Sequence, residues 1–336
     1  MRAGGIIRII VGLVVAAVLT AFLVMALGGQ NLFERLGWSG NWSGFPFYYR
    51  SNNQSTIDDG SKIVSDTESI AASSVSQIKI DWVAGSVDIR VGEGDEITFY
   101  ETANRALTDA QKMRYTLSGS GQLSIKYCAD LENVFDWFNN SNYNMPSKAL
   151  VITVPASMLG SLDRLVIDVV SAEVTVDGAY ATDMDINSVS GGVEALNLTC
   201  STLDLGSTSG RIVTENCVAD EVDVNAVSGN IRLSGTFNDI KTENVSGDTS
   251  IACANVPEKI SADGVSGNVT LKLPETAGFT AKLDSVSGGL SCAFPGTLSD
   301  KMVVVGDGSA NYRVRAVSGS IQRPALIGQI QTIPQR

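Results

Sequence analysis

A short phrase built around Val-Ser-Gly recurs through the second half of this chain, and it constrains the fold more than any other feature of the sequence. Seven copies align on a glycine, namely Gly191, Gly210, Gly229, Gly247, Gly267, Gly288 and Gly319. Successive glycines are 19, 19, 18, 20, 21 and 31 residues apart. Self-similarity at such a period is typical of solenoids and other stacked repeats, so these positions need a structural explanation before any single residue is interpreted.

Each copy follows the pattern apolar-x-apolar-x-x-apolar-Ser-Gly-x-apolar, which indicates two short strands of period two that meet at a corner. The template also fits two earlier copies, centred on Gly85 and Ala172, which makes nine. We expect the apolar residues seven, five and two positions before the glycine to face inward, Val227 among them. Strand pairs this short cannot bury an apolar face alone and must stack on their neighbours. The pattern therefore predicts an all-β fold, a β-solenoid-like stack of about nine repeats of roughly 19 residues.

Glycine and serine at the corner have an ordinary explanation in turn chemistry. Glycine tolerates a positive φ and a close backbone approach, and serine can bond a backbone group at the bend. An outward column is expected four residues before the glycine, and it is mostly acidic or amidic: Asp81, Asp168, Asn187, Gly206, Asn225, Glu243, Asp263, Asp284 and Arg315. A solvated acidic edge is the favoured interpretation. A Ca²⁺-loaded edge is the alternative, because carboxylate and amide oxygens are the ligands of that ion.

The N-terminal segment predicts a membrane anchor. Residues 9–27 contain nineteen residues of which only Thr20 is polar, enough for a helix to cross a bilayer. Arg2 and Arg8 precede this stretch, so the positive-inside tendency leaves the N-terminus in the cytoplasm and the C-terminal domain outside. A cleaved signal peptide ending before Gly29 is the alternative, although its apolar region is usually shorter. We therefore expect a single-pass cell-membrane protein with a cytoplasmic stub and transmembrane helix at 1–29.

The remaining boundaries follow from composition. Residues 30–74 begin with aromatic side chains suited to the membrane interface and continue as a polar linker expected to be flexible. The repeated-β domain is predicted at 75–323, interrupted by an insertion at 92–162 whose strands cap the stack, and residues 324–336 form a C-terminal tail. A second insertion explains the 31-residue spacing before Gly319 and is expected to form a hairpin.

Composition excludes several classes of function. The formal net charge of -12 argues against nucleic acid as a partner, because phosphate binding needs clustered lysine and arginine. The chain has no histidine, the commonest general base and metal ligand, and its five cysteines are an odd number without a C-x-x-C pair. We therefore expect no catalytic residues, no cofactor and no metal. Cys253 falls on the inward parity, as does Cys292, whereas a disulfide between Cys200 and Cys217 stays open.

One segment stands out as a candidate binding loop. Residues 130–144, within the first insertion, combine acidic and amide side chains with four aromatic residues: Phe135, Trp137, Phe138 and Tyr143. Exposed aromatic rings beside Asp and Asn can stack on sugar rings, and loops on rigid scaffolds often carry function. The alternative is a loop whose aromatic side chains pack back onto the cap.

With the "VSG" copies, the N-terminal "IKIDWVAGSVDIRVGEGDEI" and the strand "LVITVP" laid out, the chain resembles the bacterial "putative adhesin" family of repeated-β domains, also called toastrack-like, over residues 75–323. The resemblance implies a membrane-anchored, non-enzymatic envelope protein that serves in adhesion, envelope-stress sensing or scaffolding. Its partners would be the membrane, an envelope protein or glycan, or another copy of itself.

The alternative is an extracellular β-solenoid that binds or cleaves polysaccharide. Such an enzyme needs two suitably spaced carboxylates or a base beside a cation. An active site should break the repeat, and Arg313 and Arg315, expected on the last rung, are its main irregularities.

Overall fold

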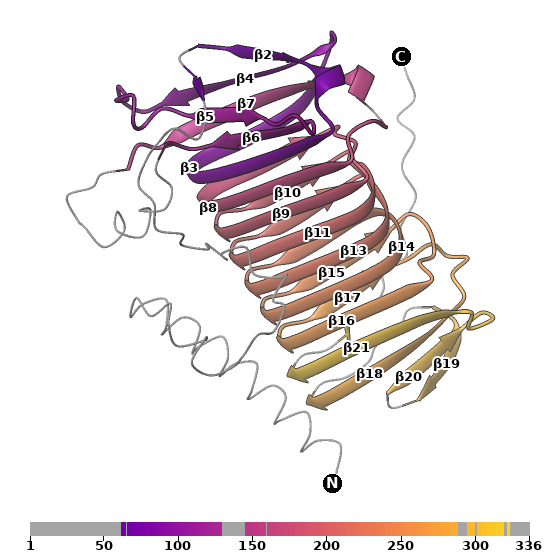
Figure 1. Cartoon of the computed structure of the whole chain (residues 1–336). Coiled ribbons are helices and arrows are strands. Elements are labelled where there is room, and N and C mark those ends of the chain that lie inside the picture. Colours follow the sequence, from indigo (N-terminus) through magenta and orange to yellow (C-terminus); the bar gives the residue numbers. More distant parts are fainter. Residues whose placement is uncertain are drawn as a thin grey trace, which may run out of the picture. The chain divides into compact units, whose positions relative to one another are not determined.

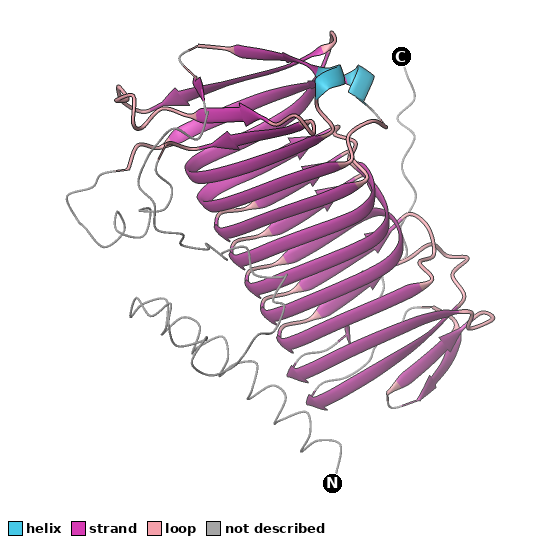
Figure 2. Cartoon of the chain, viewed as in Figure 1, coloured by secondary structure: helices cyan, strands magenta, loops and turns pink. Residues whose placement is uncertain are grey.

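The computed structural model is built almost entirely of β-strands, which confirms the all-β prediction (Figures 1 and 2). The structure describes residues 62–64, 66–129, 145–158, 160–287, 294–299, 301–318 and 321–322. Within these ranges the helices are two short 3-10 turns, η1 (Ala72–Ser74) and η2 (Ala156–Met158). None of the described helices is long or apolar enough to cross a membrane, and the predicted anchor at residues 9–27 lies outside the described part of the chain.

Successive repeats pair in parallel and in register, one rung on the next (Figure 1). Two long strands, β3 (Gln77–Gly92) and β8 (Arg164–Asp177), start the stack and pass through both faces. The segments before the glycines form one face, in the spatial order β9 (Asp183–Ser190), β11 (Thr199–Ser209), β13 (Cys217–Ser228), β14 (Ile231–Ser246), β16 (Lys259–Ser266), β21 (Ala310–Ser318) and β18 (Phe279–Ser287).

The segments after the glycines form the second face of the stack. Its strands follow β8 in the order β10 (Val193–Leu196), β12 (Ile212–Glu215), β14, β15 (Thr249–Cys253), β17 (Val269–Lys272) and β22 (Ile321–Gln322). Strand β14 belongs to both faces because it runs straight through the second corner, the one at which Asn197 and Asn216 turn the two preceding rungs. Where both segments of a repeat are described, the repeat thus adds one strand to each face, as the two-strand pattern predicts.

The N-terminal end is closed by the first insertion, as predicted. Its strands are β4 (Glu96–Ala103), β5 (Arg114–Leu117), β6 (Gln122–Lys126) and β7 (Lys148–Pro155). Strands β6 and β7 pair in parallel with the two halves of β3, whereas β4 and β5 pair with them antiparallel. Residues 62–74, expected to end a flexible linker, instead contribute β1 (Lys62–Ile63) and β2 (Glu68–Ala71), which pair with β5 and β4. The linker prediction is wrong there because these strands cover the edge of the cap.

The C-terminal end departs from sequence order. Strand β21, from the last copy, lies between β16 and β18, so the copy of Gly319 precedes that of Gly288 in space. The predicted hairpin is present as β19 (Gly296–Ser299) and β20 (Met302–Val305), and β20 also pairs with β18. Arg313 and Arg315 therefore stand on the penultimate rung and not on the last one.

The interior is filled by the predicted columns with one correction. In the copies whose side chains the structure describes, residues seven and five before the glycine and two after it are buried, for example Val222, Val224 and Ile231. The residue two before the glycine is half-buried in the later of these copies: Val227 faces outward, whereas Ala226 is 6% exposed. Val83, in the first copy, is the exception at 2% exposed. The strand stays extended up to the corner, so the inward parity continues to the third residue before the glycine.

The glycine column is explained by close contact between rungs. At Gly229 a Cβ would lie 2.1 Å from the carbonyl oxygen of Gly210, and φ is +149°. The serines before the glycines, such as Ser228, are exposed, and within the described residues no side-chain hydrogen bond of theirs is seen at the bend. A bond of that kind is made two residues earlier in the strand, where Ser188 donates to the carbonyl oxygen of Gly191 at 3.1 Å.

Candidate functional site at the base of the aromatic loop

The aromatic loop departs from the middle of a rung. Strand β6 pairs alongside the first half of β3 and β7 alongside the second half, so the two strands form one rung, which is interrupted by the chain segment that contains residues 130–144. The four predicted binding residues, Phe135, Trp137, Phe138 and Tyr143, lie outside the described residues. The structure shows the two strands that support them and the contacts that join the ends of the loop.

Lys148 is the centre of these contacts. Its side chain is 0% exposed, and its Nζ lies 2.6 Å from a carboxylate oxygen of Glu101, which is 7% exposed. The same Nζ donates hydrogen bonds to the carbonyl oxygens of Gln111, at 2.9 Å, and of Tyr127. The other carboxylate oxygen of Glu101 accepts the backbone N–H of Met113 at 2.7 Å. One buried ammonium thus ties together three segments of the cap.

Two aromatic rings complete the arrangement. Lys148 Nζ lies 3.9 Å from the ring centre of Tyr127 and 4.9 Å from that of Trp82, within the range of cation–π attraction. The two rings meet edge to face with centres 5.0 Å apart. Tyr127 donates its hydroxyl to the carbonyl oxygen of Pro146, and Trp82 Nε1 donates to that of Lys148 at 3.2 Å. We call Trp82, Glu101, Tyr127 and Lys148 the loop clamp, because it joins the chain on both sides of residues 130–144.

Burial dominates the electrostatics of the loop clamp. Desolvation lowers the pKa of Lys148, and the hydrogen bond and charge of Glu101 oppose that shift. Burial likewise raises the pKa of the Tyr127 hydroxyl, so that group stays a neutral donor. A buried charge of this kind is tolerated only when it is paired and hydrogen-bonded, as it is here. The clamp holds the cap together and is not open to a ligand, since its polar side chains are engaged with one another and with backbone groups of the cap.

The signal for Lys148 was present in the sequence, although composition alone does not reveal it. The strand "KALVITVP" places Lys148 on the same parity as Leu150, Ile152 and Val154, all of which are buried. A lysine on the inward parity of an apolar strand needs a buried partner, and the partner here, Glu101, comes from a strand 47 residues earlier.

The outward column four residues before the glycine lies where it was predicted, on the exposed side of the first face. Asp81 and Asp168 are register neighbours, and burial, followed by the charge of Asp81, raises the pKa of Asp168 to about 6. Asn187 donates to Asp168 at 3.3 Å and to Asp185 at 2.6 Å, which separates like charges on adjacent rungs. No group of three or more metal-ligating side chains is found among the described residues, so the calcium alternative gains no support.

Arg315, one of the two arginines considered for a polysaccharide-cleaving enzyme, is already paired with a carboxylate. Arg315 forms two hydrogen bonds with the carboxylate of Asp263, at 2.6 and 2.8 Å. A paired guanidinium of this kind positions a rung, so Arg315 is not a cation beside a free base; Arg313 is exposed on the same strand. The inward position of Cys253 is confirmed, Cys200 and Cys217 are free thiols in the interior, and Cys292 lies outside the described residues.

Comparison with known proteins places the stacked part of the chain in context. A protein family described as Toastrack DUF4097 matches residues 75–322. Among solved structures, a "putative cell adhesion protein" from Clostridium sporogenes is similar at 14% identity, with 78% of this chain and 99% of that one covered and a TM-score of 0.27. A "putative adhesin" from Bacteroides fragilis is similar at 13% identity, with 78% and 97% covered and a TM-score of 0.38. No curated protein matches.

Proposed function

Because the chain belongs to the Toastrack DUF4097 family, we propose that it is a non-enzymatic cell-envelope protein in which a β-solenoid-like stack presents the aromatic loop to an envelope glycan or protein. The N-terminal segment at 1–29 anchors the protein in the cell membrane, and the stack lies outside. Adhesion, stress sensing and scaffolding all require a rigid surface held at a fixed place, which a stack of parallel rungs provides.

The loop clamp is the observation that carries this proposal. A loop of fifteen residues interrupts a rung, and a buried ion pair, two aromatic rings and four hydrogen bonds hold the chain on either side of it. An ordinary surface insertion needs no such base, because long loops cost little stability. Fixed ends reduce the conformational entropy that the loop loses when it binds, so they favour recognition.

The test uses the full-length protein in detergent micelles and isolated cell-wall sacculi as the probe. Three variants are compared with the wild type: deletion of residues 130–144, the double substitution Trp137→Ala and Phe138→Ala, and Ser141→Ala as a matched change within the loop. We expect sedimentation with sacculi to be lost with the first two variants and kept with the third.

Two further results would decide against the proposal. Equal sedimentation of the wild type and the deletion variant would show that the loop is not the binding site. Release of the wild-type protein from membranes by alkaline carbonate would contradict the proposed membrane anchor. In the sedimentation test the deletion variant must melt as a cooperative unit, so that loss of binding is not loss of fold.

A further inference from the structure

One rung of the stack breaks the repeat. The interval from Gly229 to Gly247 is 18 residues, one fewer than the two intervals before it. In those two rungs the second corner is made by Asn197 and Asn216, which adopt positive φ values of 54° and 55°. Strand β14 omits this corner and runs continuously from Ile231 to Ser246. The row of corner residues therefore ends at Asn216.

The pairing between β12 and β14 changes at the same place. These strands pair at Ile212–Ile231 and Val213–Arg232, whereas β10 and β12 pair over four residues. The next residue, Thr214, is fully buried, and its hydroxyl accepts the backbone N–H of Ser234 at 3.0 Å and lies 3.4 Å from the carbonyl oxygen of Ser234. The hydroxyl of Thr214 thus takes the place of a backbone group as the hydrogen-bond partner of Ser234. Local interruptions of strand pairing of this kind also occur at β-bulges.

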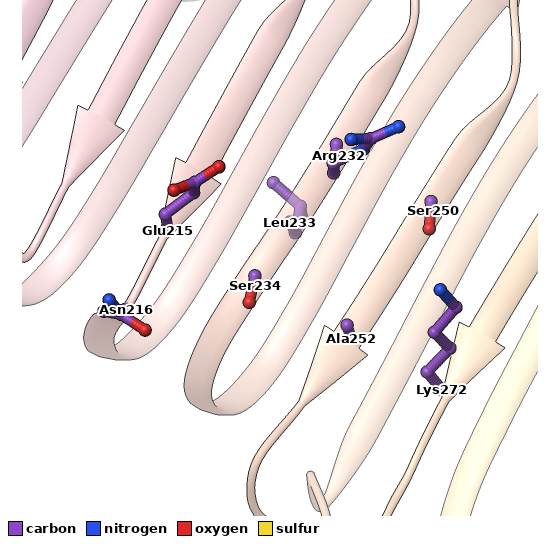
Figure 3. Close-up of a pocket in the computed structure, with 8 residues that line it drawn as sticks. All are labelled: Glu215, Asn216, Arg232, Leu233, Ser234, Ser250, Ala252 and Lys272. Atoms are coloured by element: carbon purple, nitrogen blue, oxygen red, sulfur yellow. The ribbon is translucent and has the colours of Figure 1, made fainter. Parts of the chain in front are cut away.

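An open hollow of about 390 Å³ lies over this irregularity, on the face after the glycines (Figure 3). Its floor consists of short side chains in neighbouring strands, Ser234 in β14 and Ser250 and Ala252 in β15. Figure 3 shows Glu215 and Asn216 on one side of this floor and Lys272 on the other. The volume is in the range of sites for small ligands, roughly 300 to 1,000 Å³.

The charges around the hollow are unsatisfied, in contrast with those nearby. Within the described residues Glu215, Arg232 and Lys272 are exposed and form neither an ion pair nor a side-chain hydrogen bond. On the same face Arg211 is paired with Glu194. The two free cations exceed the single carboxylate, although the whole chain carries a formal charge of -12. The hollow is therefore a local anion-attracting surface on an acidic protein.

We propose that this hollow binds a saccharide that carries carboxylate groups, such as a segment of a uronic-acid polymer. Arg232 and Lys272 supply charge-assisted donors for the carboxylates. Glu215, Asn216, Ser234 and Ser250 supply acceptors and neutral donors for ring hydroxyls, which a simple anion lacks. The floor belongs to parallel strands of a rigid sheet, so the backbone positions of Ser234 and Ser250 are fixed before the ligand arrives. The site lies on β12, β14, β15 and β17, and does not depend on the aromatic loop.

Isothermal titration of the full-length protein at about 0.15 M salt, where charges outside the hollow are screened, tests the proposal. The probes are tetragalacturonate, maltotetraose as the neutral oligosaccharide and succinate as the carboxylate without a sugar. We expect tetragalacturonate to bind, and both controls to bind at least about tenfold more weakly, since charged and neutral hydrogen bonds each contribute. The double substitution Arg232→Gln and Lys272→Gln should weaken tetragalacturonate binding by about tenfold or more.

Two variants make the interpretation specific. Arg211→Gln removes one positive charge from the same face outside the hollow and should change affinity less than about twofold. Ala252→Leu keeps both cations but fills the floor, and should abolish binding. Because the changed side chains are exposed or half-buried, melting temperatures should stay close to that of the wild type.

The proposal is overturned if the wild type binds no tetragalacturonate at millimolar concentration or if succinate binds as tightly as tetragalacturonate. It is also overturned if Arg211→Gln weakens tetragalacturonate binding as much as the double substitution does. Deletion of residues 130–144 should leave tetragalacturonate binding intact. Failure of the loop hypothesis and failure of this one are therefore distinguishable.

Discussion

Replacing Lys148 with methionine is the sharpest test of the loop clamp. Methionine keeps an unbranched apolar side chain but removes the ammonium. Glu101, 7% exposed, then loses its ion-pair partner at 2.6 Å, and the carbonyl oxygens of Gln111 and Tyr127 lose their donor. Removing one partner of a buried pair costs about 3 to 5 kcal/mol because the other charge is left uncompensated.

The expected effect is large enough to measure by calorimetry. In a domain of this size each kcal/mol lowers the melting temperature by about 2 to 4 °C, so Lys148→Met should lower it by roughly 6 to 20 °C. Adding Glu101→Gln to Lys148→Met should restore much of this loss, since glutamine is neutral and its oxygen can still accept the N–H of Met113. Lys272→Met, at an exposed unpaired lysine, is the control and should cost less than about 0.5 kcal/mol.

The double variant decides whether the reasoning is correct. If Glu101→Gln brings no recovery on the Lys148→Met background, the uncompensated carboxylate is not the cause of the loss. If Lys148→Met melts like the wild type, the clamp contributes nothing to the cap. A clamp that also fixes the loop predicts faster proteolysis within residues 130–144 in Lys148→Met, at a temperature where the stack remains folded.

Two further substitutions test the orientation of the strands and the acidic edge. Ala226→Asp would bury an unpaired carboxylate and should cost several kcal/mol, whereas Val227→Asp, on the outward parity, should cost about 1 kcal/mol or less; equal melting temperatures would contradict the inward position of Ala226. Asp168 has a folded pKa of about 6 against an ordinary 3.8, so the folded state holds the proton more tightly and loses stability as the pH rises from about 4 through 6. Asp168→Asn should remove that loss, on the order of 1 kcal/mol after solvent screening, and a stability curve measured from pH 4 to 7 that keeps its slope would refute the assignment.

Most of the repeat could be predicted from the sequence because its physical cause is local. Apolar alternation and the corner glycine are set by neighbours within one copy, and the stacking follows from the need to cover an apolar face. The misplacement of Val227 has an equally local reason. Valine recurs at that position and looks like a core column, but parity up to the corner places the smaller Ala226 inside and leaves the valine half-buried outside.

The candidate sites could be predicted only in part. The aromatic loop is visible as a change of composition, but its clamp joins residues from four separate segments, which no local pattern reports. The hollow coincides with the 18-residue interval between Gly229 and Gly247, which is visible in the sequence. The sequence does not show that the hydroxyl of Thr214 replaces a backbone partner of Ser234 there. Irregularities in a repeat point to candidate sites, although their chemistry appears only when neighbouring rungs are placed side by side.

The order of the last two rungs shows how charge could have resolved a topological choice. In sequence order the outward column would end Asp263, Asp284, Arg315, with two carboxylates adjacent. With β21 inserted between β16 and β18 it reads Asp263, Arg315, Asp284, and Arg315 bonds the first carboxylate directly. Like charges directly opposite on paired strands are destabilising and opposite charges stabilising. The 31-residue interval supplies enough chain to reach past one rung, so spacing permits the exchange and the charge column favours it.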